Sequence, residues 1–130
     1  MEERWPMKET RLSRKELGAL GEAAAADHLQ AQGFKLRGRN WHCRTGEIDL
    51  IAEDHGILVF IEVRTRSIGG TFGTPQESVN ARKQRQVMET AQVYMHMQRL
   101  QDKQVRFDVI SIQTDPTGAV RELEHIRNAF

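Results

Sequence analysis

The chain has 130 residues, of which 38% are apolar and 28% are charged, and its formal net charge is +1. This length and composition predict one soluble domain, and the nearly neutral charge argues neither for nor against a nucleic-acid partner. No run of 18 apolar residues is present and the N-terminus is charged, so neither a membrane span nor a signal peptide is expected. The one cysteine, Cys43, forms no intrachain disulfide, so we expect a cytoplasmic protein.

The first third of the chain predicts an arm and a helix. Residues 1–12 mix charges with Pro6, so we expect a flexible arm before a single domain over residues 13–130. Ser13-x-x-Glu16 is a capping box that begins a helix, and Gly33 ends it. The predicted apolar stripe of this helix contains Leu17, Leu20, Ala24 and Ala31. Glu22 lies among small residues that allow close packing on a sheet, so it either points inward or is an ordinary surface residue.

Residues 34–41 predict a first strand, and residues 46–66 predict a β-hairpin. Two apolar runs flank the polar break Glu53-Asp54-His55-Gly56. If His55-Gly56 is a two-residue turn, Asp54 pairs with Ile57, Ala52 faces Val59, and the same register places Asp49 opposite Glu62. Arg64 shares the strand face of Glu62, because side chains two residues apart point to the same side.

Two carboxylates beside a guanidinium can hold a hard divalent cation. Like charges opposite each other destabilise a sheet, so Asp49 and Glu62 need a cation between or beside them. Mg²⁺ and Mn²⁺ bind through a few carboxylates and keep positions for water and phosphate. The alternative is a surface hairpin whose charges are solvated or paired with Arg64. A loop longer or shorter by one residue would place the carboxylates on opposite faces.

The next segments predict a connection and a second helix. A glycine-rich stretch over residues 67–75 lacks the spacing of a nucleotide-phosphate loop. A helix is predicted from a cap at Asn80 to about Leu100. Its predicted apolar face contains Val87, Met88, Ala91, Tyr94 and Met95. Cations in its first turn oppose the macrodipole, so they either bind a phosphate backbone or form a solvated cluster; they are Arg82, Lys83 and Arg85.

Two further strands complete the prediction, over residues 105–113 and 120–126, with Arg106 and Asp108 as an ion pair on the first. The order helix, strand, strand, strand, helix, strand predicts an α/β sandwich with a mixed sheet. The crossover through the second helix should return parallel to the hairpin strand that precedes it. The five histidines are scattered and only one cysteine is present, so no zinc site is expected.

Several motifs together resemble the YraN-type family. They are Gly21-Glu22, GEIDLIA at 46–52, FIEVRTR at 60–66, RFDVI at 106–110 and Asn128-Ala129-Phe130. That family is a largely uncharacterised bacterial group, similar to archaeal Holliday-junction resolvases within the PD-(D/E)XK nuclease superfamily. The resemblance implies a restriction-endonuclease-like αβββαβ core that hydrolyses phosphodiester bonds in DNA. Analogy with resolvases also allows branched DNA as the substrate and a homodimer as the assembly.

The resemblance further implies a site made of a helix glutamate, a strand aspartate and a Glu-x-Lys motif. Matched onto this chain, these are Glu22, Asp49, Glu62 and the position of Arg64. Arginine departs from the superfamily pattern, because it stays protonated and cannot act as a general base. It can still position a water molecule or a phosphate oxygen. The expectation of metal binding is therefore stronger than the expectation of turnover.

The mechanism that this resemblance implies uses Mg²⁺ or Mn²⁺ as the cofactor. Asp49 and Glu62 would bind the ion with the Val63 carbonyl, and Glu22 would act through water or hold a second ion. Gln76 would help Arg64 to position the attacking water. Basic residues would grip the DNA backbone; these are Arg37, Arg39, Arg44, Arg66, Arg82, Lys83 and Arg85. The alternatives are a nucleic-acid-binding protein of nuclease fold with little or no turnover, and a protein-interaction module.

Overall fold

The computed structural model describes residues 12–67 and 79–130, which form an α/β fold with helices on both faces of a sheet. The elements in chain order are α2 (Arg14–Ala31), β1 (Lys35–Cys43), β2 (Gly46–Asp54), β3 (Ile57–Ser67), α3 (Ala81–Met97), β4 (Val105–Thr114) and β5 (Val120–Ile126). This order confirms the predicted αβββαβ sandwich and its short final strand. Gln76 and nearly all of the predicted arm and glycine-rich connection lie outside the described residues.

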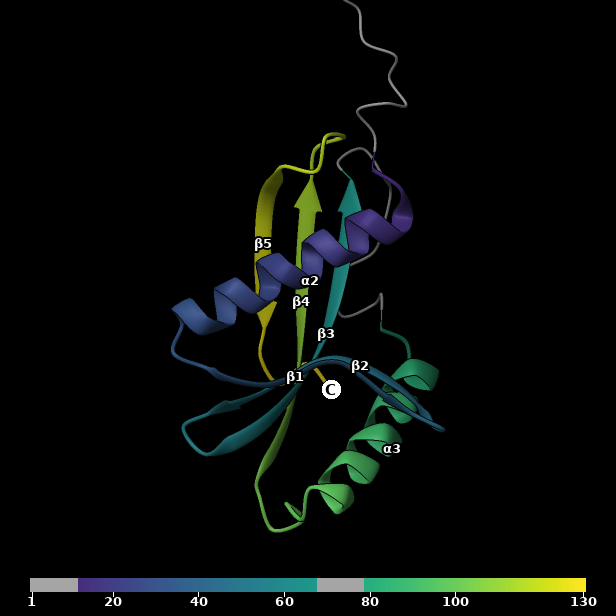
Figure 1. Ribbon diagram of the computed structural model, residues 1–130, viewed down its shortest axis with the longest axis vertical. Coiled ribbons are helices and arrows are strands. Elements are labelled where there is room, and N and C mark those ends of the chain that lie inside the picture. Colours follow the sequence, from purple (N-terminus) through teal and green to yellow (C-terminus); the bar gives the residue numbers. More distant parts are fainter. Residues whose placement is uncertain (1–11, 68–78) are drawn as a thin grey trace, which may run out of the picture.

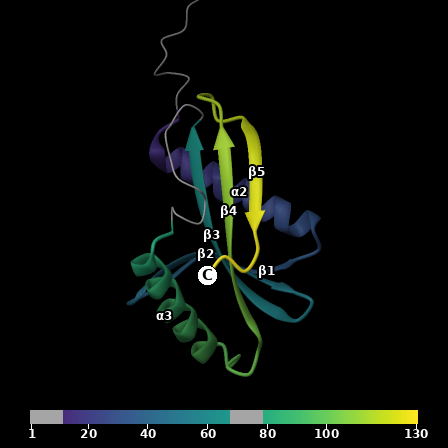
Figure 2. The same cartoon turned by 180° about the vertical axis from the view of Figure 1, so that it is seen from behind.

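The strands form one mixed sheet in the order β1-β2-β3-β4-β5. The crossover through α3 returns β4 parallel to β3, as predicted, and the other pairs are antiparallel. The neighbours Phe60 and Ile61 of β3 belong to different core clusters, so their side chains lie on opposite faces of the sheet. The Ile61 cluster contains residues of α2, and the Phe60 cluster contains residues of α3. Figure 1 shows α2 crossing in front of β3, β4 and β5, and Figure 2 shows it behind them.

Helix α2 begins and ends as predicted but buries a different face. The Glu16 N–H donates to Ser13 Oγ over 3.1 Å, and the Ser13 N–H donates to the Glu16 carboxylate over 2.8 Å. The predicted stripe is wrong except at Ala24, which packs partly buried against the core. The fully buried residues of this helix are Gly21, Ala25, Ala26 and Leu29. A Cβ atom at Gly21 would lie 1.8 Å from Thr65 Oγ1, so this helix packs on β3 through its backbone rather than through large side chains.

The turn of the β2–β3 hairpin has the predicted form. His55 and Gly56 have φ angles of 51° and 84°, and two positive values are typical of a type I′ turn. Asp54 pairs with Ile57, and the register continues as far as Leu50 and Ile61. There the β2–β3 pairing ends, one position before Asp49 and Glu62, while residues 62–67 of β3 still pair with β4. We call residues 62–67 the open edge of β3.

Helix α3 is capped by Asn80, whose Oδ1 accepts the Lys83 N–H over 2.9 Å. It ends at Met97, before the predicted Leu100, and Arg99 then adopts a positive φ of 57°. Its buried residues include Val87, Ala91 and Tyr94, but the predicted core residue Met88 is 38% exposed. Within the part of the chain that the structure describes, no helix is long and apolar enough to cross a membrane.

The C-terminal segment is attached to the sheet through Asp108, which is fully buried. Arg106 donates to both oxygens of Asp108, over 2.9 and 3.0 Å, which confirms the predicted ion pair. The Asn128 N–H donates to Oδ1 of the same carboxylate, and His125 Nε2 lies 2.8 Å from Oδ2. The ring of Phe130 stacks on Phe107. These contacts give the RFDVI and Asn-Ala-Phe motifs a structural role.

Candidate functional site

A pocket of 690 Å³ lies between the start of α2, the open edge of β3 and the first turn of α3. Its charged lining residues are Arg14, Glu22, Asp49, Glu62, Arg64, Arg66 and Lys83. The pocket therefore contains the four side chains predicted to be catalytic, together with three further cations. We call it the acidic pocket, after the three carboxylates on its wall.

The acidic pocket exists because β2 leaves β3 at Asp49. In place of a backbone ladder, the Val63 N–H donates to Asp49 Oδ2 over 2.8 Å. The N–H and C=O groups of one strand residue point to the same side, so the Val63 carbonyl points toward Asp49 as well. This is the direction that the predicted carbonyl ligand requires. Burial raises the pKa of Asp49, and the hydrogen bond from Val63 opposes that rise.

Glu62 is the most buried acid of the pocket, at 2% exposure. Its Oε1 lies 3.5 Å from Lys83 Nζ, whereas its Oε2 is buried without a hydrogen-bond partner among the described residues. Burial, and secondly the charge of Asp49, raise the pKa of Glu62 to about 7. A buried polar atom without a partner costs roughly 1–3 kcal/mol of stability, and a ligand that binds Oε2 would remove this cost.

Glu22 is half-buried on the wall of the acidic pocket, which supports the inward of the two predicted orientations. Its pKa is raised by burial first, lowered by a hydrogen bond with Asn40, and raised by the charges of Asp49 and Glu47. Asn40 has a φ of 50°, a conformation that asparagine tolerates better than most residues. Sequence patterns did not single out Asn40, because a residue inside a predicted strand carries no signal that it will leave the ladder.

The acidic pocket fits a divalent cation held by two carboxylates rather than three. Among residues 12–67 and 79–130, no group of three His, Cys, Asp or Glu side chains could hold one ion together. Glu22 therefore stands apart from the pair formed by Asp49 and Glu62. Mg²⁺ is commonly bound by one or two carboxylates, with waters and phosphate as its other ligands. The Oε2 atom of Glu62, which has no hydrogen-bond partner in the described part of the chain, is suited to such an ion.

The cations of the acidic pocket come from three elements. Lys83 of α3, predicted to contact the DNA backbone, has its Nζ atom 3.5 Å from Oε1 of Glu62. Arg64 and Arg66 come from the open edge of β3, and the Nε atom of Arg64 is buried without a hydrogen-bond partner among the described residues. Arg14 comes from the first turn of α2, and the sequence patterns did not identify it as a site residue. A cation in the first turn opposes the helix macrodipole, and this feature, which indicated the cations of α3, could have identified Arg14 as well.

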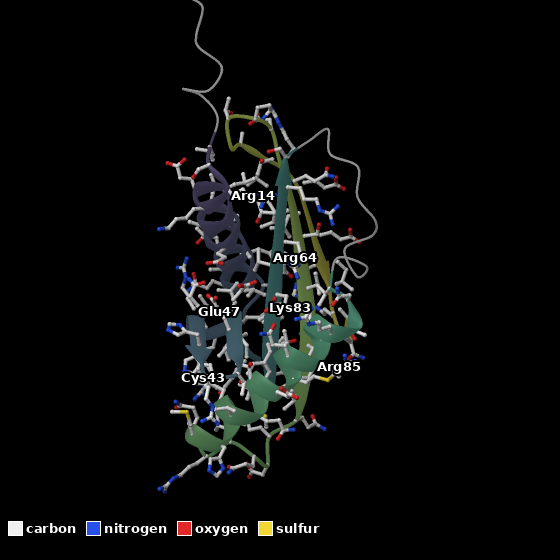
Figure 3. All side chains as sticks on the ribbon, turned by 90° about the vertical axis from the view of Figure 1, so that its right-hand side faces the viewer. Arg14, Cys43, Glu47, Arg64, Lys83 and Arg85 are labelled. Carbon is white, nitrogen blue, oxygen red and sulfur yellow. The ribbon has the colours of Figure 1, made fainter. Side chains whose placement is uncertain are left out.

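A second pocket, of 550 Å³, adjoins the first at the start of α3. It is lined by Thr45, Asn80, Arg82, Lys83, Arg85, Gln86 and Glu89. Lys83 lines both pockets, so the two are contiguous there. Figure 3 shows Arg14, Arg64, Lys83 and Arg85 following one another along one side of the molecule, from the start of α2 to the start of α3. We call this row of cations the basic track.

The remaining predicted phosphate contacts lie on β1 and in the turn that follows it; they are Arg37, Arg39 and Arg44. Arg37 donates to the Glu53 carboxylate and to the Tyr94 hydroxyl, so it is engaged on the α3 side of the sheet. The charge of Arg39 lowers the pKa of Glu22, which places Arg39 near the wall of the acidic pocket. Arg44 is exposed in the turn between β1 and β2. Periodicity alone could not separate these three arginines, because it assigns faces without showing which partner each side chain meets.

Comparison with known proteins gives a consistent family. A model described as "Uncharacterised protein family UPF0102" matches residues 21–112 of this chain. A UPF0102 protein of Geotalea daltonii is 46% identical over 116 residues, covering 89% of this chain and 90% of its own length. One from Geobacter metallireducens is 44% identical over 119 residues, covering 92% and 95%. One from Clostridium botulinum is 40% identical over 117 residues, covering 89% and 94%.

Proposed function

The chain belongs to the uncharacterised protein family UPF0102, and we propose that it is a divalent-cation-dependent endonuclease that hydrolyses phosphodiester bonds in DNA. The observation that carries this proposal is the pair formed by half-buried Asp49 and buried Glu62 on the pocket wall, in which Oε2 of Glu62 has no hydrogen-bond partner among residues 12–67 and 79–130. Lys83 lies 3.5 Å from Oε1 of Glu62, but the pKa of both acids is still raised by burial, so the pair remains costly for the fold unless further positive charge binds to it. Two such carboxylates beside an open pocket form a site that can bind a cation.

The cations that line the same pocket as the acid pair are suited to bind the phosphates of a substrate. A divalent ion needs carboxylates, and a phosphodiester needs positive charge or hydrogen-bond donors. Both sets line the acidic pocket, where Arg14, Arg64, Arg66 and Lys83 surround the carboxylates. The basic track continues past the pocket along α3, so neighbouring phosphates of the same strand can be held as well. This combination favours a polymeric phosphodiester over a small metabolite.

In this mechanism Asp49 and Glu62 would hold Mg²⁺ or Mn²⁺, with the Val63 carbonyl as a further ligand. When bound there, such an ion would supply a water of lowered pKa and positive charge beside the phosphate. Arg64 stays protonated, so it orients a water or a phosphate oxygen through hydrogen bonds and accepts no proton. Glu22, which lines the pocket apart from the acid pair, would hold a water molecule at the wall. Arg66 and Arg14 contact non-bridging oxygens of the substrate.

A second candidate function is nucleic-acid binding without turnover. The observation that favours it is Arg64, which occupies the position where the resembled superfamily has lysine and which cannot act as a general base. This reading keeps the basic track and the cation site but assigns them to binding alone. It predicts DNA affinity that falls steeply with salt, without cleavage in Mg²⁺ or Mn²⁺.

The test combines cleavage with matched variants. Linear, flapped and four-way DNA, and an RNA duplex of the same sequence, are incubated with protein in Mg²⁺, Mn²⁺ or EDTA. Asp49→Ala and Glu62→Gln should each abolish cleavage, while Asp102→Asn, an exposed carboxylate that lines neither pocket, should leave it unchanged. Cleavage that survives both site substitutions would come from a contaminant, and a preference for RNA would refute the DNA assignment. Binding without cuts would support the second candidate.

A further inference from the structure

The position of Lys83 supports a more specific role than a contact to the DNA backbone. Building on the proposed function, we infer that Lys83 contacts the phosphate that is cleaved and stabilises the charge that develops on it, whereas Arg82 and Arg85 hold only neighbouring phosphates. Lys83 would then be a catalytic residue contributed by α3 to a site otherwise built from α2, β2 and β3.

The geometry places the Lys83 ammonium at the acid pair. Its Nζ lies 3.5 Å from Glu62 Oε1, and its side chain is 31% exposed, so it lies partly under the surface of the pocket. Its backbone N–H is bound to Asn80 Oδ1 at the helix cap, which fixes the start of the side chain. Arg82 and Arg85, in contrast, are exposed and line only the second pocket. Lys83 is thus the cation where the basic track passes the carboxylates.

The electrostatics agree with this placement. The Lys83 charge lowers the pKa of both Asp49 and Glu62, and in each case it lowers the pKa more than the charge of Arg64 does. A phosphate oxygen bound near this pair would therefore lie in the field of the ammonium as well. Charges placed in advance where a transition state becomes more negative are among the largest contributions to enzyme rates.

Lys83 is also poorly explained as a purely structural residue. A cation in the first turn of a helix opposes the macrodipole, and α3 has no acidic residue there to compensate. Its separation of 3.5 Å from Glu62 is longer than the usual charge-assisted hydrogen bond of about 2.7–2.9 Å. A divalent ion on Glu62 would repel the ammonium, and the flexible lysine stem could then turn to a phosphate oxygen.

The chain provides a closely matched control in Lys103. Its Nζ lies 3.7 Å from Glu53 Oε2, and its side chain is 30% exposed, so its pairing and burial resemble those of Lys83. Lys103 lines neither the acidic pocket nor the second pocket. A difference between the two lysines therefore reports on position at the site and not on the loss of a half-buried ion pair.

The first arm of the test separates catalysis from binding. Lys83→Ala should lower kcat on DNA by roughly 100-fold or more, the usual effect of removing one such donor, with less than a threefold change in DNA affinity measured in EDTA. Arg85→Ala should do the reverse, weakening affinity and reducing the slope of log K against log salt by about 1. Lys103→Ala should change neither. Lys83→Arg keeps the charge and should recover at least tenfold of the lost rate, and melting curves confirm that each variant folds.

The inference is overturned if Lys83→Ala cleaves like the unchanged protein, or if the loss of activity in Lys83→Ala comes only from weaker DNA binding, as for Arg85→Ala.

A second arm of the test needs no turnover. Lysines are ¹³C-dimethylated, the Lys83 signal is assigned by its loss in Lys83→Arg, and a short DNA is added in Ca²⁺. A shift of the Lys83 signal larger than that of Lys103 supports contact with substrate even if the unchanged protein never cuts DNA; equal shifts refute it. Failure of the endonuclease proposal is therefore distinguishable from failure of this inference.

Discussion

Glu62 is expected to destabilise the cation-free protein, which gives a test that needs no substrate. Its pKa rises from 4.5 to about 7 because it is buried beside Asp49. A difference of about 2.5 units at about 1.36 kcal/mol per unit corresponds to roughly 3 kcal/mol. The folded protein binds this proton more tightly than the unfolded chain does. Stability from this group is therefore fully present below pH 4.5 and is lost as the pH rises to about 7.

The substitution Glu62→Gln removes the charge and keeps the shape. We expect it to raise the free energy of unfolding by roughly 1–3 kcal/mol at pH 8 in EDTA, with the gain disappearing near pH 4. Urea unfolding followed by circular dichroism measures this, since a slope of about 1–3 kcal/mol per M places the midpoint shift near 1 M. Adding Mg²⁺ should raise the midpoint of the unchanged protein and leave that of the variant where it is.

Glu53 on the same hairpin is the control with the opposite sign. Burial raises its pKa, but its hydrogen bond with Arg37 and the charge of Lys103 lower it overall. Glu53→Gln should therefore lose stability at pH 8 and lose progressively less as the pH falls below the ordinary pKa of a glutamate. A Glu62→Gln variant that is also less stable at pH 8 would show that Glu62 is a structural ion-pair partner, and the cation-site argument would fail.

Three further predictions concern packing, anchoring and binding. Gly21→Ala should be destabilised by roughly 1–3 kcal/mol in urea unfolding, because its Cβ would lie 1.8 Å from Thr65 Oγ1; Gly18→Ala in the same helix meets nothing within 4 Å and should instead be stabilised by up to about 1 kcal/mol. Asp108→Asn should lower the free energy of unfolding by roughly 3–5 kcal/mol. Burial raises the pKa of Asp108, but its hydrogen bonds lower it overall, so the stability that this group provides is lost as the pH falls below 3.8. The variant should therefore show a weaker dependence of stability on pH in acid, and an unchanged dependence would contradict this. Arg82→Ala should weaken DNA binding similarly for all sequences and lower the salt slope by about 1, measured by fluorescence anisotropy.

Much of the backbone could be derived from local chemistry in the sequence. The capping box at Ser13, the cap at Asn80 and the turn at His55-Gly56 each satisfy requirements of their own few residues, so neighbouring sequence is enough to predict them. The position of the His55-Gly56 turn determines the hairpin register, which the structure follows as far as Leu50 and Ile61. Extending that register by one position was enough to predict that Asp49 and Glu62 lie near each other.

Burial and the partners of charged side chains depended on the tertiary structure. Helix α2 buries Gly21 instead of the predicted leucines, because the sheet admits a close approach that no periodicity reveals. Lys83 meets Glu62 because the β2–β3 pairing ends before Asp49 and the start of α3 lines the pocket that opens there. Hydrophobic patterns report which face of an element is apolar. Where two elements separate, and which charges meet in that space, is decided by the packing of the whole sheet against both helices.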